Sequence, residues 1–422
     1  MKRRGFLIGG AAAAMGAGFL LRPGDEGAPH EDYFARLNAE LKLNGPMRPV
    51  MLVDLDRLDQ NIDLIRQGIP EGKHYRVVAK SVPSGSMIDY VLKRAGTKRL
   101  MAFHQPFLNQ HAQRWPDADI LLGKPMPVRA AARFYHEHSG EFDPARQLQW
   151  LIDSPARAAQ YLELARGQDL KLRLNIELDV GLHRGGVTAG RDLADILGLI
   201  EADPARLEFA GFMGYDPHVV KVPSVIASQQ ALLDKAMAIY QAAVDQVKAD
   251  HPYLWNSQLT LNTAGSPTYR LHQQETLSND IAVGSALVKP TDFDVPTLEG
   301  HLPAAFIATP VLKRTGEVEI PGLDGNSRIL SWWDINQRES YFTYGGYWQA
   351  QYASPAGLRN SGLYGRSSNQ ELVTGSPATA LKVDDQIFLR PTQSEFVFLQ
   401  FGDLLAVRNG KLVDRWPVFA QG

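Results

Sequence analysis

Cysteine is absent from the sequence. Its absence excludes disulfide bonds, thiolate nucleophiles and metal sites built on cysteine. A chain without thiols is compatible with an oxidising compartment, although this does not show that the protein reaches one. Any catalytic chemistry must therefore come from other side chains.

An excess of charge of one sign is also missing, because 44 Lys and Arg residues are balanced by 46 Asp and Glu residues. No global field then draws the protein to nucleic acid or to an anionic membrane surface. No GxxxxGK[ST] motif occurs, and no GxGxxG follows the first predicted strand, so P-loop and dinucleotide sites lose their main support. A chain of 422 residues with ordinary globular composition has room for one large domain and a smaller one, with small molecules as the expected partners.

The first residues follow the order of a secretory signal. Lys2, Arg3 and Arg4 precede an apolar, Ala/Gly-rich run that ends at Leu21. This order resembles a twin-arginine signal, which implies that the twin-arginine export machinery carries the folded, cofactor-loaded protein to the periplasm. No Ala-x-Ala cleavage site follows the run, so an uncleaved membrane anchor remains an alternative. We expect residues 1–28 to be the signal and a linker.

Short apolar runs alternate with amphipathic helical segments over residues 29–300, which predicts a (β/α)8 TIM-type barrel of α/β class. From residue 301 to 422 the pattern changes to short β-like runs with Gly, Pro and Asn turns, which predicts a C-terminal all-β domain. The expected barrel strands are Val50–Asp54, Tyr75–Lys80, Arg99–Phe103, Asp119–Gly123, Leu148–Ile152, Lys171–Asp179, Leu207–Tyr215 and Gln258–Ala264. Phe396–Phe401 and the pair Trp332-Trp333 are assigned to strands and turns of the β domain.

The ends of the barrel strands carry the residues with chemical potential, because the active sites of such barrels lie at the carboxyl ends of the strands. The second predicted strand delivers Lys80 to this edge, where a partly desolvated amine can react with an aldehyde. A surface lysine that merely closes the strand is the alternative. Arg184 lies in a glycine-loosened loop after the sixth strand, and Tyr215 ends the seventh. Gly265 and Ser266 follow the last predicted strand and form a plausible phosphate cradle.

The order of these motifs resembles the D-threonine aldolase and D-serine dehydratase family, which has the alanine-racemase barrel. The resemblance covers most of the chain after the signal. It rests on Val53–Asp56 with Asn61, Arg76–Ser81, Glu177–Val187, Gly211–Tyr215, Gly265–Tyr269 and Val413–Phe419.

The resemblance implies pyridoxal 5'-phosphate as cofactor and a homodimer. It makes Lys80 both the Schiff-base lysine and a base at the substrate α-carbon, places Arg184 at the pyridine nitrogen, and lines the pocket with Tyr215. The phosphate would be held by Gly265, Ser266, Gly284 and Ser285.

One departure from the family concerns metal binding. Family aldolases and dehydratases bind a divalent metal through a His-x-Asp or His-x-Cys pair, but the corresponding segment here places Gln393 and Glu395 at those positions. Glutamine is a poor transition-metal ligand, whereas Glu395 could still hold a hard cation with water. Gln393 and Glu395 are alternatively hydrogen-bonding or acid–base groups that face the substrate.

The sequence therefore predicts an exported pyridoxal-phosphate lyase that acts on a D-amino acid with a β-hydroxyl group. An amino-acid racemase on the same scaffold is the alternative that the missing metal pair favours, and a family member that binds cofactor or amino acid without turnover is a third. The aromatic cluster of Tyr341, Tyr344, Tyr347 and Trp348 is assigned to the core or an interface of the β domain. The alternative is that one of these tyrosines is the opposite-face proton donor of a racemase. The histidines His136 and His138 lie two positions apart and so face different sides of a helix, which indicates a surface rather than a metal site.

Overall fold

The computed structural model describes residues 22–319, 322 and 328–421. The chain forms two compact units. The sheet unit comprises the described part of Met1–Leu52 together with Phe306–Thr392 and Leu405–Asp414, and the barrel unit comprises Val53–Ala305, Gln393–Leu404 and the described part of Arg415–Gly422. The two units do not follow the expected division at residue 300, since residues 29–52 belong to the sheet unit and two C-terminal segments belong to the barrel unit.

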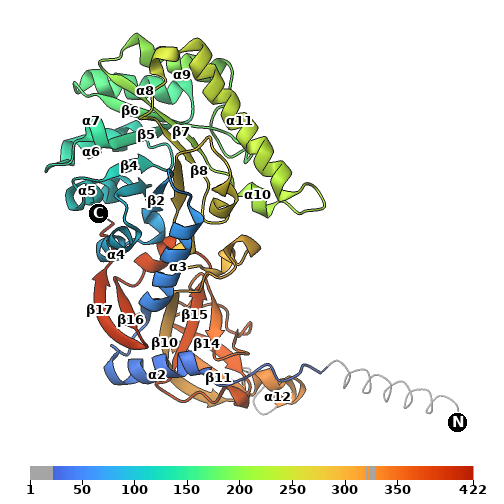
Figure 1. The fold of residues 1–422 in the computed structure, drawn as a ribbon. Helices are drawn as coiled ribbons and strands as arrows, with labels where there is room; N and C mark the ends of the chain where they lie inside the picture. Colours follow the sequence, from blue (N-terminus) through green and yellow to red (C-terminus); the bar gives the residue numbers. More distant parts are fainter. Residues whose placement is uncertain (1–21, 320–321, 323–327, 422) are drawn as a thin grey trace. The chain divides into compact units, whose positions relative to one another are not determined.

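The barrel unit contains a closed ring of eight strands in sequence order, all paired in parallel (Figure 1). The strands are β2 (His74–Val78), β3 (Arg99–Ala102), β4 (Asp119–Leu122), β5 (Leu148–Ile152), β6 (Leu172–Glu177), β7 (Leu207–Gly214), β8 (Thr260–Thr263) and β9 (Asp280–Val283). The predicted barrel class is therefore confirmed.

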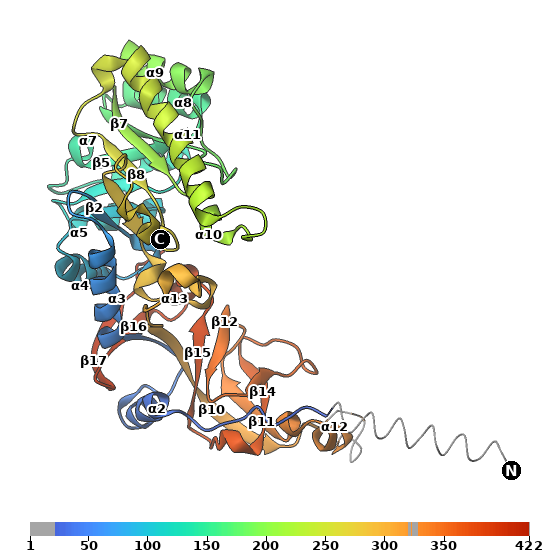
Figure 2. The same cartoon turned by 45° about the vertical axis from the view of Figure 1, so that its right-hand side comes forward.

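Helices lie between the barrel strands. They are α3 (Leu55–Gly68), α4 (Gly85–Ala95), α5 (Gln105–Arg114), α6 (Val128–Glu137), α7 (Pro144–Gln147), α8 (Pro155–Gly167), α9 (Arg191–Ala202), α10 (His218–Lys221) and α11 (Gln229–Asp250). The long helix α11 runs along the outside of the ring in both Figure 1 and Figure 2. A further helix of this unit, α13 (Glu395–Leu399), comes from near the end of the chain.

Local sequence signals begin and end these helices. Helix α8 begins after Ser154, whose hydroxyl accepts from the backbone N–H of Arg157, and has Pro155 at its first position, where no backbone donor is needed. Helix α4 ends at Gly96, whose φ of 69° is the left-handed conformation that glycine adopts without strain. These signals fix where α8 begins and where α4 ends.

One strand assignment was wrong. Val50–Asp54, expected to be the first barrel strand, is β1 of the other sheet, and the missing barrel strand is β9, which the sequence analysis did not recognise. All five residues of β1 are buried and a helix follows directly, so the segment has the local signature of a barrel β–α unit. Strand β9 has only four residues and gives almost no periodic signal.

The sheet unit is built on a nine-stranded sheet with the main strand order β13-β14-β11-β10-β1-β16-β17, while β15 pairs with β10 and β12. Its strands after β1 are β10 (Ala305–Gly316), β11 (Glu339–Tyr344), β12 (Ala350–Ser354), β13 (Arg359–Asn360), β14 (Gln370–Gly375), β15 (Gln386–Pro391), β16 (Asp403–Arg408) and β17 (Lys411–Pro417). Its helices are α2 (Asp32–Asn44) and α12 (Arg328–Trp333).

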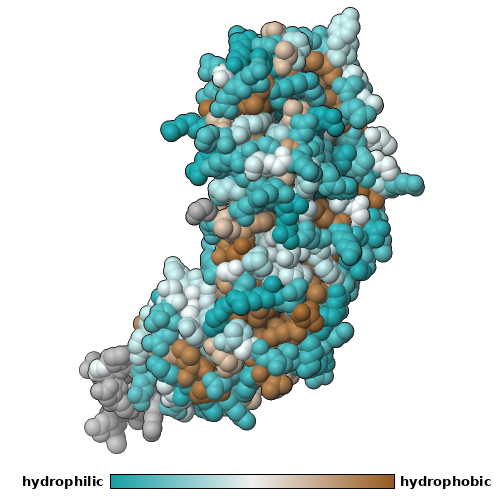
Figure 3. All heavy atoms as spheres, turned by 90° about the vertical axis from the view of Figure 1, so that its left-hand side faces the viewer, coloured by the Kyte–Doolittle hydropathy of each residue, from teal (hydrophilic) through white to brown (hydrophobic). Residues whose placement is uncertain are grey.

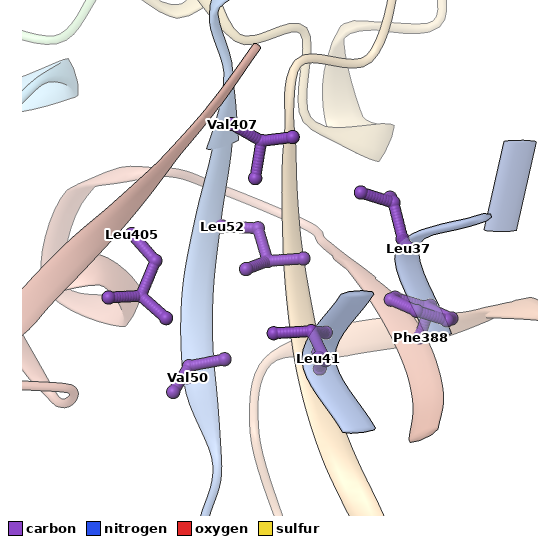
Figure 4. Close-up of a cluster of buried hydrophobic side chains, with 8 residues drawn as sticks. Leu37, Leu41, Val50, Leu52, Phe388, Leu405 and Val407 are labelled. Atoms are coloured by element: carbon purple, nitrogen blue, oxygen red, sulfur yellow. The ribbon is translucent and has the colours of Figure 1, made fainter. Parts of the chain in front are cut away.

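Helix α2 explains why residues 29–52 belong to this unit. Leu37 and Leu41, one turn apart on the helix, are each 2% exposed and pack against the sheet (Figure 4). Their partners come from four strands and are Val50, Leu52, Ala308, Phe388, Leu405 and Val407. The core of the C-terminal domain thus depends on a segment from near the start of the chain.

Two further expectations in the C-terminal region were wrong. Phe396–Phe401 was assigned to β structure but begins inside helix α13, and Trp332-Trp333 ends helix α12. The twin-arginine segment lies in residues 1–21, outside the described residues. None of the helices in the described part of the chain is both long enough and apolar enough to span a membrane. The surface in Figure 3 is mainly hydrophilic, with separate apolar patches.

Candidate active site

Lys80 lies just beyond β2, in the single turn of 3₁₀ helix η1 (Ala79–Ser81). Its ammonium Nζ lies 2.5 Å from Oε1 of Glu395 and 4.6 Å from the ring centroid of Phe103, which follows β3. The side chain is 38% exposed, so the amine is accessible to a small molecule. An ion-paired ammonium has no lone pair for attack on an aldehyde, so reaction at Lys80 requires that this pair open and a proton leave.

Two loops beyond β8 and β9 form a cradle of hydroxyl and backbone N–H groups. The backbone N–H groups of Gly284 and Ala286 donate to Oγ of Ser266 at 3.1 and 3.0 Å, and Oγ of Ser285 lies 3.2 Å from Oγ of Ser81. Such a concentration of neutral donors suits an anion.

Glycine is required in both loops of the cradle. A Cβ atom on Gly284 would lie 2.6 Å from Oγ of Ser81, and one on Gly265 would lie 2.4 Å from the ring of Tyr215. Neither distance is tolerable for a Cβ atom. The two glycines therefore allow the loops to approach their neighbours closely.

Arg184 is held in a tight loop after β6. The carboxylate of Asp179 accepts from the backbone N–H groups of Gly181 and His183, which folds the loop back on the strand end. The guanidinium Cζ of Arg184 lies 5.0 Å from the ring centroid of Tyr215, a cation–π distance. Burial raises the pKa of the Tyr215 phenol, and the positive charge of Arg184 opposes this rise.

One cavity of about 330 Å³ at the carboxyl ends of the barrel strands brings these groups together. All the residues that the sequence analysis proposed for the site line it, namely Lys80, Arg184, Tyr215, Gly265, Ser266, Gly284, Ser285, Gln393 and Glu395. The corrected strand order puts the two glycine–serine pairs after the seventh and eighth barrel strands, where phosphate sites of such barrels are commonly found. The roles of the individual residues remain predictions.

A buried polar network that the sequence analysis missed supports the Gly265 loop. Oγ1 of Thr268 accepts from the backbone N–H of Gly265 and donates to Asp216, whose other oxygen lies 2.7 Å from Nε2 of His272. Burial alone would lower the pKa of His272, but the carboxylates of Asp216 and Glu275 raise it to about 9. His272 is therefore a buried imidazolium at neutral pH.

This network predicts that the protein loses stability in mild alkali. The folded-state pKa of His272 is raised from 6.5 to about 9, so its contribution is complete below pH 6.5 and is lost as the pH rises through 9. We expect the free energy of unfolding to fall by up to about 3 kcal/mol over this range. Urea titrations between pH 6 and 9.5 measure it.

This decrease in the free energy of unfolding with rising pH should be smaller in His272→Gln. It should persist in His183→Gln, because the imidazole of His183 is paired with Asp179 but is 80% exposed. Equal slopes in wild type and His272→Gln would contradict a buried imidazolium.

The donor set at the expected metal position does not suit a transition metal. Nε2 of Gln393 donates to Oδ2 of Asp292 at 3.0 Å, and Glu395 is paired with Lys80. Within residues 22–319, 322 and 328–421, no group of three or more His, Cys, Asp or Glu side chains is arranged to hold a metal ion.

The remaining candidates do not line this cavity. His138 contacts the carbonyl oxygen of Phe142 at 2.9 Å and stacks on Phe134, while the hydroxyl of Tyr341 pairs with that of Thr379 inside the sheet unit. Tyr344 and Tyr347 are also in the sheet unit and are exposed. Ser81 and Phe103 are site residues that the sequence analysis missed, although each lies next to a strand end already recognised as important.

The closed parallel barrel, with a cavity at the carboxyl ends of its strands, defines a TIM-type barrel protein whose candidate site lies at the end where such barrels carry their active sites. Residues 53–291 match the family model described as "Alanine racemase, N-terminal domain". The chain belongs to this family.

The individual relatives share little sequence identity with this chain. The chain is 24% identical over 279 residues to 3-hydroxy-D-aspartate aldolase of Paracoccus denitrificans (strain Pd 1222), a match that covers 64% of this chain and 66% of the relative, just under two thirds of its length. The crystal structure of D-threonine aldolase from Filomicrobium marinum superposes with a TM-score of 0.68 at 15% identity, covering 89% of this chain and 98% of that one. Alanine racemase from Bacillus anthracis gives a TM-score of 0.65 at 16% identity, with 88% and 97% covered. These structural likenesses establish the fold.

The residues present fit pyridoxal phosphate. The hydroxyl groups of Ser81, Ser266 and Ser285 can donate to a phosphate group, and two backbone N–H groups hold Ser266 in place. The glycine positions in the cradle leave no room for side chains. Lys80 offers a primary amine and Arg184 a cation that does not give up its proton, and both line the same cavity. The chemistry of this donor set is thus complete for an aldehyde cofactor with one phosphate.

Proposed function

We propose that the protein is a pyridoxal-phosphate-dependent lyase that cleaves D-amino acids carrying a β-hydroxyl group. The observation that carries this proposal is the presence of the Lys80 amine and the glycine–serine cradle in one cavity. The similarity to an aldolase of a 3-hydroxy D-amino acid, and the fold shared with D-threonine aldolase, support this reaction over others of the family.

In this proposal Lys80 has two tasks and each other residue has one. Lys80 holds the cofactor covalently and, once released, exchanges a proton with the substrate α-carbon. Arg184 faces the ring nitrogen and, because it stays protonated, disfavours a proton there. Ser81, Ser266 and Ser285 bind the phosphate. When bound, the cofactor supplies an electron sink for the pair left at the α-carbon.

In our proposal the carboxylate of Glu395 acts on the substrate β-hydroxyl in place of the divalent metal of the aldolases that the sequence resembles. With the cofactor and substrate bound, the nitrogen of Lys80 would be directed to the cofactor and the substrate α-carbon, so the carboxylate of Glu395 would be left facing the cavity. It then accepts the proton of the substrate β-hydroxyl as the Cα–Cβ bond breaks. The products are an aldehyde and, after the α-carbon regains a proton, glycine.

A substrate screen tests the function. The protein loaded with pyridoxal phosphate is incubated with D-threonine, D-serine and 3-hydroxy-D-aspartate, with and without a chelator, and the products are identified. Equal amounts of glycine and aldehyde, also in the presence of chelator, are expected. Racemised substrate without glycine would establish the racemase instead, and quantitative recovery of every substrate would leave only a binding protein.

The role of Glu395 gives a separate prediction. Glu395→Gln keeps the shape of the side chain but cannot accept a proton, so kcat for aldehyde formation should fall by about 100-fold. Exchange of the α-protons of glycine in D₂O, followed by NMR, depends on Lys80 and should fall less than about tenfold. Glu395→Asp should recover part of the lost rate. An equal loss in both reactions would point to a structural role.

Export is also part of the proposal, supported by the paired arginines near the N-terminus. The double substitution Arg3→Lys/Arg4→Lys preserves charge but removes the arginine pair. The full-length variant should accumulate in the cytoplasm of a bacterial host, whereas the wild type should appear in the periplasmic or membrane fraction. Equal distribution of both proteins would exclude the twin-arginine route. The homodimer remains an expectation from family likeness.

A further inference from the structure

A second, smaller cavity of about 160 Å³ adjoins the candidate active site within the barrel unit. Lys80, Phe103 and Glu395 line both cavities. The ion pair between Lys80 and Glu395 therefore lies at the boundary between them. A molecule whose reacting carbon lies near the Lys80 amine can extend a substituent from the first cavity into the second.

The lining of the second cavity is mainly apolar. Besides Phe103, its walls include Phe107, Phe396 and Leu399. The ring of Phe107 lies 4.7 Å from that of His104 and 5.2 Å from that of Phe419, centroid to centroid, so that aromatic rings support one another around the space. A cavity of about 150 Å³ lined by apolar side chains accommodates benzene, so this space has the size of one aromatic ring.

His104 and His111 add polar but uncharged groups to the walls of the second cavity. His111 is only 2% exposed, and Nδ1 of both His104 and His111 has no hydrogen-bond partner among the described residues. Burial lowers the pKa of His111 to about 3 and also lowers that of His104. Both rings are therefore uncharged at neutral pH, and they can serve one neutral polar atom of an occupant but cannot neutralise a carboxylate.

We propose that this cavity binds the side chain of the substrate and that the preferred substrate carries an aromatic ring on its hydroxylated β-carbon. The inference rests on the proposed function and specifies its substrate class. Burial of a ring against these apolar walls favours binding of an aromatic side chain. For a side chain that ends in a carboxylate, the cations at the cavity wall are Lys124, which is exposed, and Lys80, which holds the cofactor in the proposed function.

Kinetics of the loaded enzyme test the preference. We expect kcat/KM for D-3-phenylserine to exceed those for D-threonine and 3-hydroxy-D-aspartate by at least about tenfold. Leu399→Trp fills the second cavity from α13 without touching the first, and should reduce this preference at least about tenfold. Leu399→Met, with similar volume, is the matched control and should keep it. Should Leu399→Trp not fold, Phe107→Trp narrows the same cavity from another lining residue.

A binding measurement separates this inference from the proposed function. Fluorobenzene followed by ¹⁹F NMR should bind the wild type and Leu399→Met, and should bind Leu399→Trp much more weakly. Binding with this pattern, but no turnover of any β-hydroxy amino acid, would support the cavity and overturn the proposed function. Turnover that favours D-threonine or 3-hydroxy-D-aspartate and is unaltered by Leu399→Trp would overturn the inference. So would the failure of fluorobenzene to bind.

Discussion

Replacing Lys80 with alanine should abolish both turnover and covalent attachment of pyridoxal phosphate. Lys80 is the amine at the boundary of the two cavities, 2.5 Å from Glu395, and in the proposed reaction it both holds the cofactor and moves the α-proton. Loss of both tasks should reduce kcat by about 1,000-fold or more. Absorbance spectra and mass spectrometry after borohydride reduction report the attachment independently of activity.

Two variants control for other effects of the substitution. Lys80→Arg keeps a cation beside Glu395 and should preserve the fold, yet it cannot form the bond with an aldehyde. Lys221→Ala removes another ammonium that lines the cavity and should leave the reducible adduct on the protein. An adduct that survives in Lys80→Ala would contradict the assignment and with it the whole proposed function.

The sequence analysis located the site better than it located the strands. Lys80, Tyr215 and Gly265 were chosen because they follow apolar runs, and the carboxyl ends of parallel strands meet at one rim whichever strand is counted first. The error at Val50–Asp54 therefore left the site intact. A local pattern of buried residues followed by a helix cannot show which sheet a strand joins, because that depends on distant partners.

The features of the site and the fold that the sequence did not predict depend on contacts between segments far apart in the chain. The pairing of Lys80 with Glu395 joins residues more than 300 positions apart, and the Asp216–His272 contact buries an ion pair that neither local sequence indicates. Helix α13 was missed since its five residues are nearly all apolar and lack helical periodicity. Such features follow from the assembled fold rather than from any short stretch of sequence.

The barrel interior contains an ion-pair network that should make one carboxylate indispensable for stability. Arg76 of β2 has a fully buried side chain whose Nε and Nη2 donate to the two carboxylate oxygens of Asp280 of β9, at 2.8 and 3.0 Å. Asn262 donates to the same carboxylate at 2.6 Å. Burial alone would lower the pKa of Arg76, but the carboxylates of Asp280 and Asp119 raise it, so the guanidinium is charged inside the barrel.

Asp280→Ala should lower the free energy of unfolding by about 3–5 kcal/mol, because it leaves Arg76 buried without its bidentate partner. Asp117→Ala is the matched control, since its partner Lys98 and its own side chain are 71% and 63% exposed, and it should cost less than about 1 kcal/mol. The double variant Arg76→Met/Asp280→Leu removes both charges and should be more stable than Asp280→Ala. Urea unfolding of the wild type and the three variants measures these differences in stability. If Asp280→Ala were no less stable than Asp117→Ala, the pairing of β2 with β9 that closes the barrel would not depend on the Arg76–Asp280 ion pair.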